Sequence, residues 1–214
     1  MGNSAVQKAY EWLRHNIAMG TLRAGTFIEE ANVVEATGVS RTPVREAFHR
    51  LAGERYLELV PRRGAQIRHI TARDAAEIYD ARRAIETFAA RQVCQKGIRL
   101  TSEVDELLSR MDDFSPLASL EAGIEFRDLD REFHRAFVSA DGNRLLVQLY
   151  DSIWPQQERV AMRTLSVLTE SSVNLVRAQH REILAALRNR DAETAVAHIE
   201  AHLRPVPGWN ETLD

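Results

Sequence analysis

The strongest constraint on the fold is a change of period within the first seventy residues. Apolar residues recur at helical spacing in residues 5–20, in residues 29–37 and in a third segment that begins at Ser40. Residues 56–60 and 65–70 instead have strand character, and Pro61-Arg62-Arg63-Gly64 between them is typical of a tight turn. Three helices followed by a hairpin predict a winged helix-turn-helix domain over residues 1–70.

The predicted third helix lies in the stretch "SRTPVREAFHRL", residues 40–51. Ser40 is predicted to cap it, because a serine hydroxyl can accept a hydrogen bond from a first-turn amide. Pro43 is tolerated there, since a first-turn amide lacks an intrahelical partner anyway. The predicted buried stripe has i, i+3, i+4, i+7 spacing and consists of Val44, Ala47, Phe48 and Leu51.

Polar residues share the flank beside that stripe, which is the arrangement of a helix that reads a DNA major groove. They are Arg41, Thr42, Arg45 and His49. Arginine suits this role because its planar fork can bind O6 and N7 of guanine together. At the hairpin tip, Arg62 and Arg63 suit a backbone or minor-groove contact, and Gly64 permits a close approach. A single arginine of this kind is more often a solvated surface residue, but the combination favours DNA.

The distribution of charge agrees with this interpretation. The net charge of −3 divides into ten Lys/Arg against seven Asp/Glu in residues 1–70 and eighteen against twenty-four in the rest. Only the first part is therefore expected to meet a polyanion. One cysteine, Cys94, excludes an internal disulfide and is expected to be a packing residue. No apolar run is long enough to span a membrane, so we expect a cytoplasmic protein without a membrane partner.

The remainder of the chain has helical spacing throughout, which makes the fold mainly α. We expect an all-helical domain of six helices over residues 71–206 and a tail over 207–214. Pro155 is expected to kink the fourth of these helices. The six predicted helices span 71–95, 101–113, 117–140, 142–168, 172–189 and 191–204.

Four histidines lie in this helical region. Asp130 and His134 are at i, i+4, a separation that lets two side chains hold one ion from a single helix. His180 lies near the centre of an apolar helix face, where a lone histidine is most often a hydrogen-bonded core residue. His198 and His202 form a rival i, i+4 pair, but the helical wheel turns His202 towards the apolar stripe and leaves His198 more solvated.

Three imidazoles and one carboxylate would suit Zn²⁺ or Ni²⁺, with Mn²⁺ as a further candidate. Spacing alone leaves open that these are unrelated histidines on separate helices. A metal-dependent hydrolase is a second interpretation, although the chain has no His-Glu-x-x-His motif. A third is a structural or sensed metal in a domain that serves mainly for dimerisation.

The segment "GVSRTPVREAFHRLAGERYLELVPRRGAQI" resembles the DNA-binding domain of the GntR family of bacterial transcription regulators. The resemblance covers about sixty residues, and it implies that the family's DNA contacts correspond to Ser40, Arg41, Thr42, Arg45 and Gly64. Many members carry an arginine at the position of Ala31, so one phosphate or base contact is expected to be missing here.

Residues 71–204 resemble the FCD effector-binding domain of the FadR subfamily, in its shorter, VanR-like form. The marks are "IYDARRAIE", "DREFHRAF", "QHREILAALRNRD" and "AHIEAHL". The resemblance implies that the metal ligands are Asp130, His134, His180 and His202, and that Arg82 grips the carboxylate of an effector. Arg82 is also placed to pair with Glu86 at i, i+4.

The resemblance therefore implies a homodimeric transcription regulator, with a repressor as the family tendency. The helical domain would bind a divalent metal and a small organic carboxylate that modulates binding to a double-stranded, palindromic operator. No catalytic residue is expected.

Overall fold

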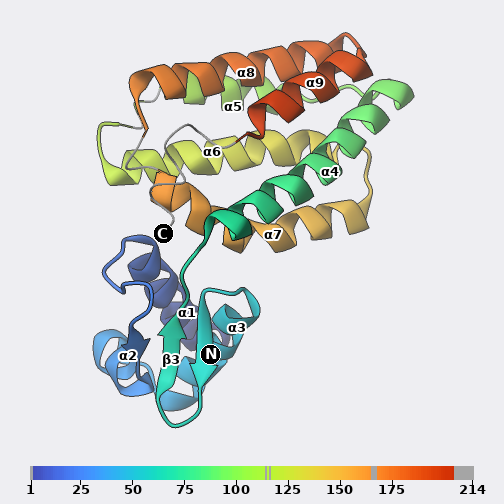
Figure 1. The fold of residues 1–214 in the computed structure, drawn as a ribbon. Helices are drawn as coiled ribbons and strands as arrows, with labels where there is room; N and C mark the ends of the chain where they lie inside the picture. The colour runs from blue at the N-terminus through green and yellow to red at the C-terminus, as the bar shows by residue number, and fades with distance from the viewer. Residues whose placement is uncertain (1, 114, 116, 165–167, 205–214) are drawn as a thin grey trace. The chain divides into compact units, whose positions relative to one another are not determined.

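A computed structural model describes residues 2–113, 115, 117–164 and 168–204, which form two compact units. The first comprises residues 2–71 with Pro155–Met162, and the second comprises the other described residues. Figure 1 shows the elements of each unit. The predicted tail over residues 207–214 lies outside the described residues. In the described part of the chain, no helix is long and apolar enough to cross a membrane.

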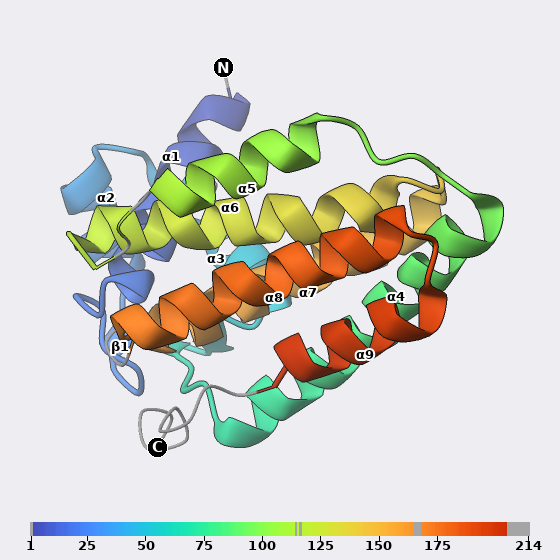
Figure 2. The same ribbon diagram turned by 90° about the horizontal axis from the view of Figure 1, so that it is seen from above.

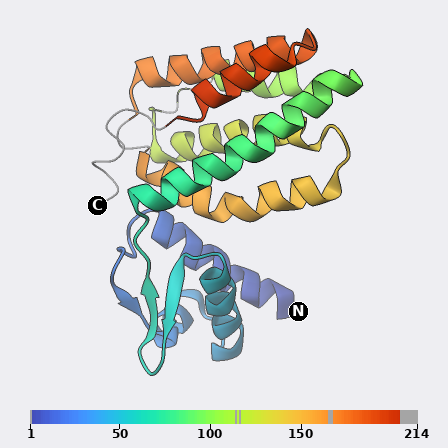
Figure 3. The same cartoon turned by 45° about the vertical axis from the view of Figure 1, so that its right-hand side comes forward.

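The first unit is a winged helix-turn-helix, as predicted. Its helix α3 packs against α1, α2 and strand β2, and the strand order of its antiparallel sheet is β1-β3-β2 (Figure 3). The predicted stripe of Val44, Ala47, Phe48 and Leu51 is buried. The elements are α1 (Gly2–Ala18), β1 (Phe27–Ile28), α2 (Glu30–Thr37), α3 (Arg41–Gly53), β2 (Leu57–Val60) and β3 (Gly64–Ile67).

Two local details differ from the expectation. Ser40 is the N-cap of α3, but its side chain makes no capping hydrogen bond. A capping hydroxyl usually accepts from the second or third helical amide, and the third residue here is Pro43, which has no N–H. No strand was predicted before the second helix, but β1 pairs with β3, with Phe27 opposite Gln66 and Ile28 opposite Ala65.

The second unit is the predicted helical bundle. Helix α6 packs against α4 and α5, while α9 packs against α4 and α8 (Figure 2). Cys94 is buried in this core, as expected. Pro155 lies inside α7 without ending it. The helices are α4 (Ala72–Lys96), α5 (Glu103–Asp113), α6 (Leu120–Ser139), α7 (Arg144–Thr164), α8 (Glu170–Arg188) and α9 (Ala192–His202).

Side-chain caps define the start of three of these helices. Ser119 accepts from the amide of Ala122, Thr169 from Ser172 and Asp191 from Thr194. These caps fix where α6, α8 and α9 begin, and the apolar spacing within each helix determines which side chains face the core.

Candidate metal centre and candidate DNA-binding surface

Three of these helices bring one carboxylate and three imidazoles together. Asp130 and His134 come from α6, His180 from α8 and His202 from α9, and one ligand atom of each lies within 4.8 Å of all the others. We call these four residues the candidate metal site. His134 and His180 are fully buried, whereas the Asp130 side chain is 17% exposed.

The three Nε2 atoms form a nearly equilateral triangle. The separations are 3.2 Å for His134–His180, 3.1 Å for His134–His202 and 3.2 Å for His180–His202. The Oδ1 atom of Asp130 lies 3.1 Å from Nε2 of His180 and 3.9 Å from that of His134. Ligand bonds of about 2.0–2.1 Å to one ion would place neighbouring donor atoms about 2.8–3.4 Å apart, from octahedral to tetrahedral angles. The three histidine spacings therefore match those around one bound divalent cation.

Neighbouring acceptors set the tautomers of two of the histidines. Nδ1 of His134 donates to Oε2 of Glu86 at 2.6 Å, and Nδ1 of His202 donates to Oε1 of Gln179 at 3.0 Å. Each neutral ring carries one N–H, so both Nε2 atoms present lone pairs at a separation of 3.1 Å. Only His180 can supply an Nε2–H, and one hydrogen cannot bond well to both of these nitrogens and to Asp130. A cation among them would meet all four ligand atoms.

The electrostatics favour the metal-binding protonation states of His180, His202 and Asp130. Burial lowers the pKa of His180, and burial with the neighbouring histidines lowers the pKa of His202 well below its usual value. Burial alone would raise the pKa of Asp130, but the hydrogen bond from His180 and nearby positive charge outweigh it, so the pKa lies below its usual range. Neutral imidazoles and an ionised carboxylate are the forms that bind metal.

Arg82 and Glu86 form a buried ion pair next to the candidate metal site. Nε of Arg82 donates to Oε1 of Glu86 at 2.6 Å, and both side chains are nearly inaccessible to solvent. Burial acts to raise the pKa of Glu86, but Arg82 and His134 outweigh it and lower the pKa overall. Glu86 therefore connects the arginine implied to bind a carboxylate with a candidate metal ligand.

Neighbouring Arg83 has different contacts, because it donates to the carbonyl oxygen of Leu203 at 2.7 Å and pairs with Asp80. His198 also lies apart from the candidate metal site. Its ring is one-third exposed and lies 3.3 Å from Glu182.

Sequence reasoning did not find the roles of Glu86 and Gln179 in orienting histidines. Glu86 carried a usable signal, because a charged residue at its position interrupts the apolar spacing of Ala89, Ala90 and Val93 along the buried face of α4. Gln179 gave no such signal. It precedes His180 on α8, and adjacent helical residues do not share a face, so nothing in the sequence indicated a contact with His202.

The predicted DNA-binding side chains are accessible. Arg41, Thr42, Arg45 and His49 are exposed on α3. Nε of Arg45 contacts Oε1 of Glu30 at 2.6 Å, which holds its guanidinium over the junction of α2 and α3. Ala31, at the position where many family members carry an arginine, lies exposed on α2.

The wing tip is shaped by Arg62 and Gly64, which both have left-handed backbone conformations, with φ of 65° and 83°. The guanidinium of Arg63 lies 4.0 Å from the ring centroid of Phe27. A Cβ atom at position 64 would come within 2.4 Å of the carbonyl oxygen of Ile28. Glycine at this position is therefore required by the pairing of β1 with β3, whatever its role towards DNA.

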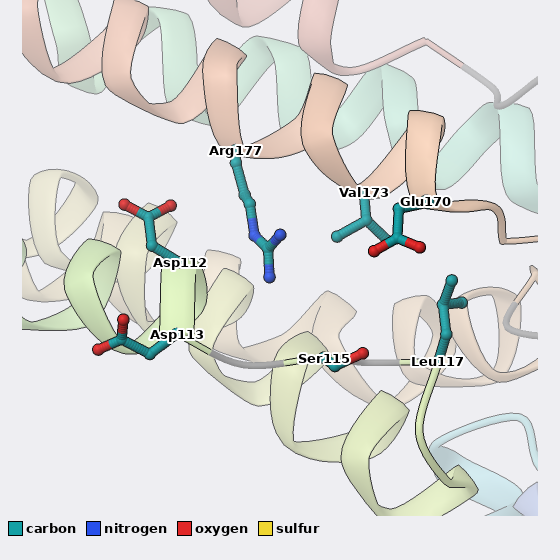
Figure 4. A pocket seen from close by; sticks show the side chains of 7 residues that line it. All are labelled: Asp112, Asp113, Ser115, Leu117, Glu170, Val173 and Arg177. Atoms are coloured by element: carbon teal, nitrogen blue, oxygen red, sulfur yellow. The ribbon is translucent and has the colours of Figure 1, made fainter.

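A separate hollow of about 200 Å³ lies between the end of α5 and the start of α8 (Figure 4). It contains none of the predicted site residues. Arg177 points into it but donates through Nε to the carbonyl oxygen of Met111, while Asp112 pairs with Arg181. We assign no function to this acidic hollow. Its lining residues are Asp112, Asp113, Ser115, Leu117, Glu170, Val173 and Arg177.

Family comparisons decide what kind of protein carries these features. The model of bacterial regulatory proteins of the gntR family matches residues 5–67, and that of the FCD domain matches residues 77–205. The chain belongs to the GntR family and carries an FCD domain. It is thus a DNA-binding transcription regulator and not an enzyme, so the hydrolase interpretation is set aside.

Three similar proteins represent this GntR–FCD class. The gluconate operon transcriptional repressor of Bacillus subtilis is 29% identical, over 99% of this chain and 86% of its own length. The Nta operon transcriptional regulator of Aminobacter aminovorans is 30% identical, over 85% of this chain and 83% of its own. The crystal structure of a putative GntR regulator from Rhodococcus matches with a TM-score of 0.71 at 27% identity, over 94% of both chains.

The lowered histidine pKa values predict an acid-sensitive metal-free GntR–FCD regulator. Because His180 and His202 bind protons more readily when unfolded, their contribution to stability falls as the pH drops below about 6.5. Asp130 and Glu86, with lowered pKa values, add a further loss below about pH 4. Urea unfolding with chelator present should give a smaller free energy of unfolding at about pH 5.5 than at about pH 7.5.

A His202→Asn variant is the control for this GntR–FCD protein, because it removes the more strongly shifted histidine and should flatten the dependence between these two pH values. Stability that is unchanged or higher at the lower pH would contradict the expectation.

Proposed function

We propose that this protein is a repressor whose FCD domain binds one divalent metal ion and a small organic carboxylate, and whose affinity for its operator depends on that carboxylate. Asp130, His134, His180 and His202 would hold the metal, and Arg82 would bind the carboxylate. The observation that carries the proposal is the Nε2 triangle, whose sides measure 3.1–3.2 Å and which lies 3.1 Å from Oδ1 of Asp130 at its His180 corner.

The donor set fits Zn²⁺ or Ni²⁺, and Mn²⁺ is a further candidate. Four protein ligands leave positions in an octahedral shell for ligand oxygens. Nη2 of Arg82 is buried and has no hydrogen-bond partner among the described residues, which suits a carboxylate placed beside the ion. If the carboxylate binds two states of the protein with different affinity, it would shift the balance between those states and so change the affinity for DNA.

On the DNA side, we propose that Arg41, Thr42 and Arg45 read bases in the major groove, with Ser40 and His49 beside them. Arg62, Arg63 and Gly64 would meet the backbone or minor groove. A homodimer would read two half-sites of a palindromic operator, as helix-turn-helix proteins commonly do. The net positive charge of residues 1–70 supports this assignment.

One experiment tests the metal and the carboxylate together. Protein purified without chelator or nickel resin is analysed for bound metal, and its affinity for a duplex selected from a random pool is measured by fluorescence anisotropy. Carboxylates are then added at constant metal occupancy. Gluconate is the first to test, because a relative is a gluconate operon repressor.

Near-stoichiometric metal with a carboxylate-dependent change in DNA affinity is the expected result. A change caused by metal alone would make the ion itself the signal. Absence of metal after reconstitution would reduce the domain to a dimerisation module and overturn the proposal.

Arg45→Ala is expected to lower the affinity for the selected duplex and to relax its base preference. Because a bidentate arginine–guanine contact can discriminate between bases, we expect the ratio of specific to non-specific affinity to fall roughly five- to hundredfold. Anisotropy titrations with the selected duplex and with single-base variants measure this ratio.

The matched control is Arg73→Ala, which removes an equal charge from an exposed i, i+4 pair outside the DNA-binding domain. It should leave the ratio unchanged. If Arg45→Ala behaves like this control, Arg45 does not read a base.

A further inference from the structure

Two buried hydrogen-bond donors near the candidate metal site lack a partner. Nη2 of Arg82, on α4, and the hydroxyl of Tyr150, on α7, are both inaccessible to solvent and have no hydrogen-bond partner among the described residues. Tyr150 as a whole is 1% exposed. Buried polar groups are nearly always hydrogen-bonded, so each of these two donors needs an explanation.

Tyr150 shares the buried core of the bundle with Phe133, whose ring centroid lies 5.3 Å from that of His134. Burial raises the pKa of its hydroxyl well above the usual value, with the charges of Arg82, Glu86 and Asp130 acting on it as well. The hydroxyl therefore stays protonated and can donate. Its ring packs in the same hydrophobic core as Phe133 and Ile183, so the hydroxyl cannot readily turn out to solvent.

The neighbouring carboxylates already have other partners. Glu86 accepts from Nε of Arg82 and from His134, and Asp130 lies 3.1 Å from Nε2 of His180. No described residue accepts from these two donor atoms, which points to an acceptor outside the chain. A group with several lone pairs and a negative charge matches a guanidinium and a hydroxyl together.

We propose that Tyr150 is an effector-binding residue, whose hydroxyl donates to the same carboxylate group that Nη2 of Arg82 binds. This inference rests on the proposed function and adds a second contact to it. The effector class is a small carboxylate with one oxygen directed to the metal and the other to these donors. Tyr150 contributes to effector affinity and not to metal affinity, since it is not one of the four metal ligands.

The test uses full-length protein loaded with Co²⁺, with acetate as the minimal carboxylate probe. Calorimetry gives the dissociation constants of cobalt and of acetate, and the visible absorption of cobalt reports a change in its ligands. Tyr150→Phe removes only the hydroxyl and keeps the ring in the core. We expect this variant to bind cobalt like the wild type and to bind acetate about tenfold more weakly or worse, because a hydrogen bond to a charged group is lost.

Tyr10→Phe is the matched control. It also removes a hydroxyl that hydrogen-bonds to a carboxylate, that of Glu54, but in the DNA-binding domain. It should leave both dissociation constants unchanged. A Tyr150→Phe variant that binds acetate as tightly as the wild type would overturn the inference, as would a wild-type protein that takes up cobalt but no acetate.

Failure of the proposed function gives a different result. If the wild type takes up no cobalt, the proposed metal site is wrong, and acetate binding to metal-free wild type and Tyr150→Phe still decides the role of Tyr150. Equal affinities, or no binding to either protein, would then overturn the inference as well.

Discussion

His180→Ala is expected to abolish stoichiometric metal binding, whereas His198→Ala is expected to retain it. His180 contributes one corner of the Nε2 triangle and is the ligand nearest to Asp130. Its loss leaves two imidazoles and a carboxylate, with a void between α6 and α8. His198 is also a histidine of α9, but its partly exposed ring faces Glu182.

Metal analysis of the two variants after dialysis against metal-free buffer measures this difference. Asp130→Asn provides a second test, because it keeps the shape of the site while removing its negative charge, and it should weaken binding without unfolding the domain. Circular dichroism of each variant shows whether the helices persist. Metal lost from a His198→Ala protein, or kept by a well-folded His180→Ala protein, would refute the assignment of ligands.

Glu86→Ala is expected to lower the free energy of unfolding by about 3–5 kcal/mol, which is typical when one member of a buried ion pair is removed. Arg82 would keep a buried charge without its partner, and Nδ1 of His134 would lose its acceptor. Urea unfolding of metal-free protein above neutral pH measures the loss.

Helix α4 contains a matched control for this variant. Arg73 and Glu77 are the same residue types at the same i, i+4 spacing, but they are exposed. Because exposed pairs contribute little, Glu77→Ala should be close to wild type. The double variant Arg82→Met/Glu86→Leu should recover part of the stability lost in Glu86→Ala, since it leaves no unpaired charge. If Glu86→Ala and Glu77→Ala lowered the free energy of unfolding equally, the buried ion pair would contribute no more to stability than the exposed one.

Much of the fold could be predicted from local patterns. The apolar stripe of α3 follows from 3.6-residue periodicity, and the wing follows from alternation around the Pro61–Gly64 turn. Strand β1 could not be predicted, because two residues are too few to show a strand period. Ser40 was correctly predicted as the N-cap of α3, but the predicted capping hydrogen bond is absent, because Pro43 at the third helical position has no N–H.

The four residues of the candidate metal site could be predicted as a group. Asp130 and His134 lie one helical turn apart, the helical wheel turned His202 inwards, and the resemblance favoured His180 as a ligand over a core residue. The residues around the site could not be predicted. Glu86 meets His134 across 48 positions, and Gln179 meets His202 across 23. Such contacts depend on how helices are packed, which the spacing along any one helix does not encode. The proposed role of Tyr150 could not be predicted for the same reason, because it depends on residues of other helices.

The buried position of Cys94 has a practical consequence. The thiol is enclosed in the helical core, and burial raises its pKa, so it should react slowly with thiol-directed dyes. A cysteine introduced at an exposed position, such as Glu46→Cys on α3, would then be the one readily labelled site in the chain. A fluorophore attached there could follow the arrival and departure of DNA in real time, without removal of the native thiol.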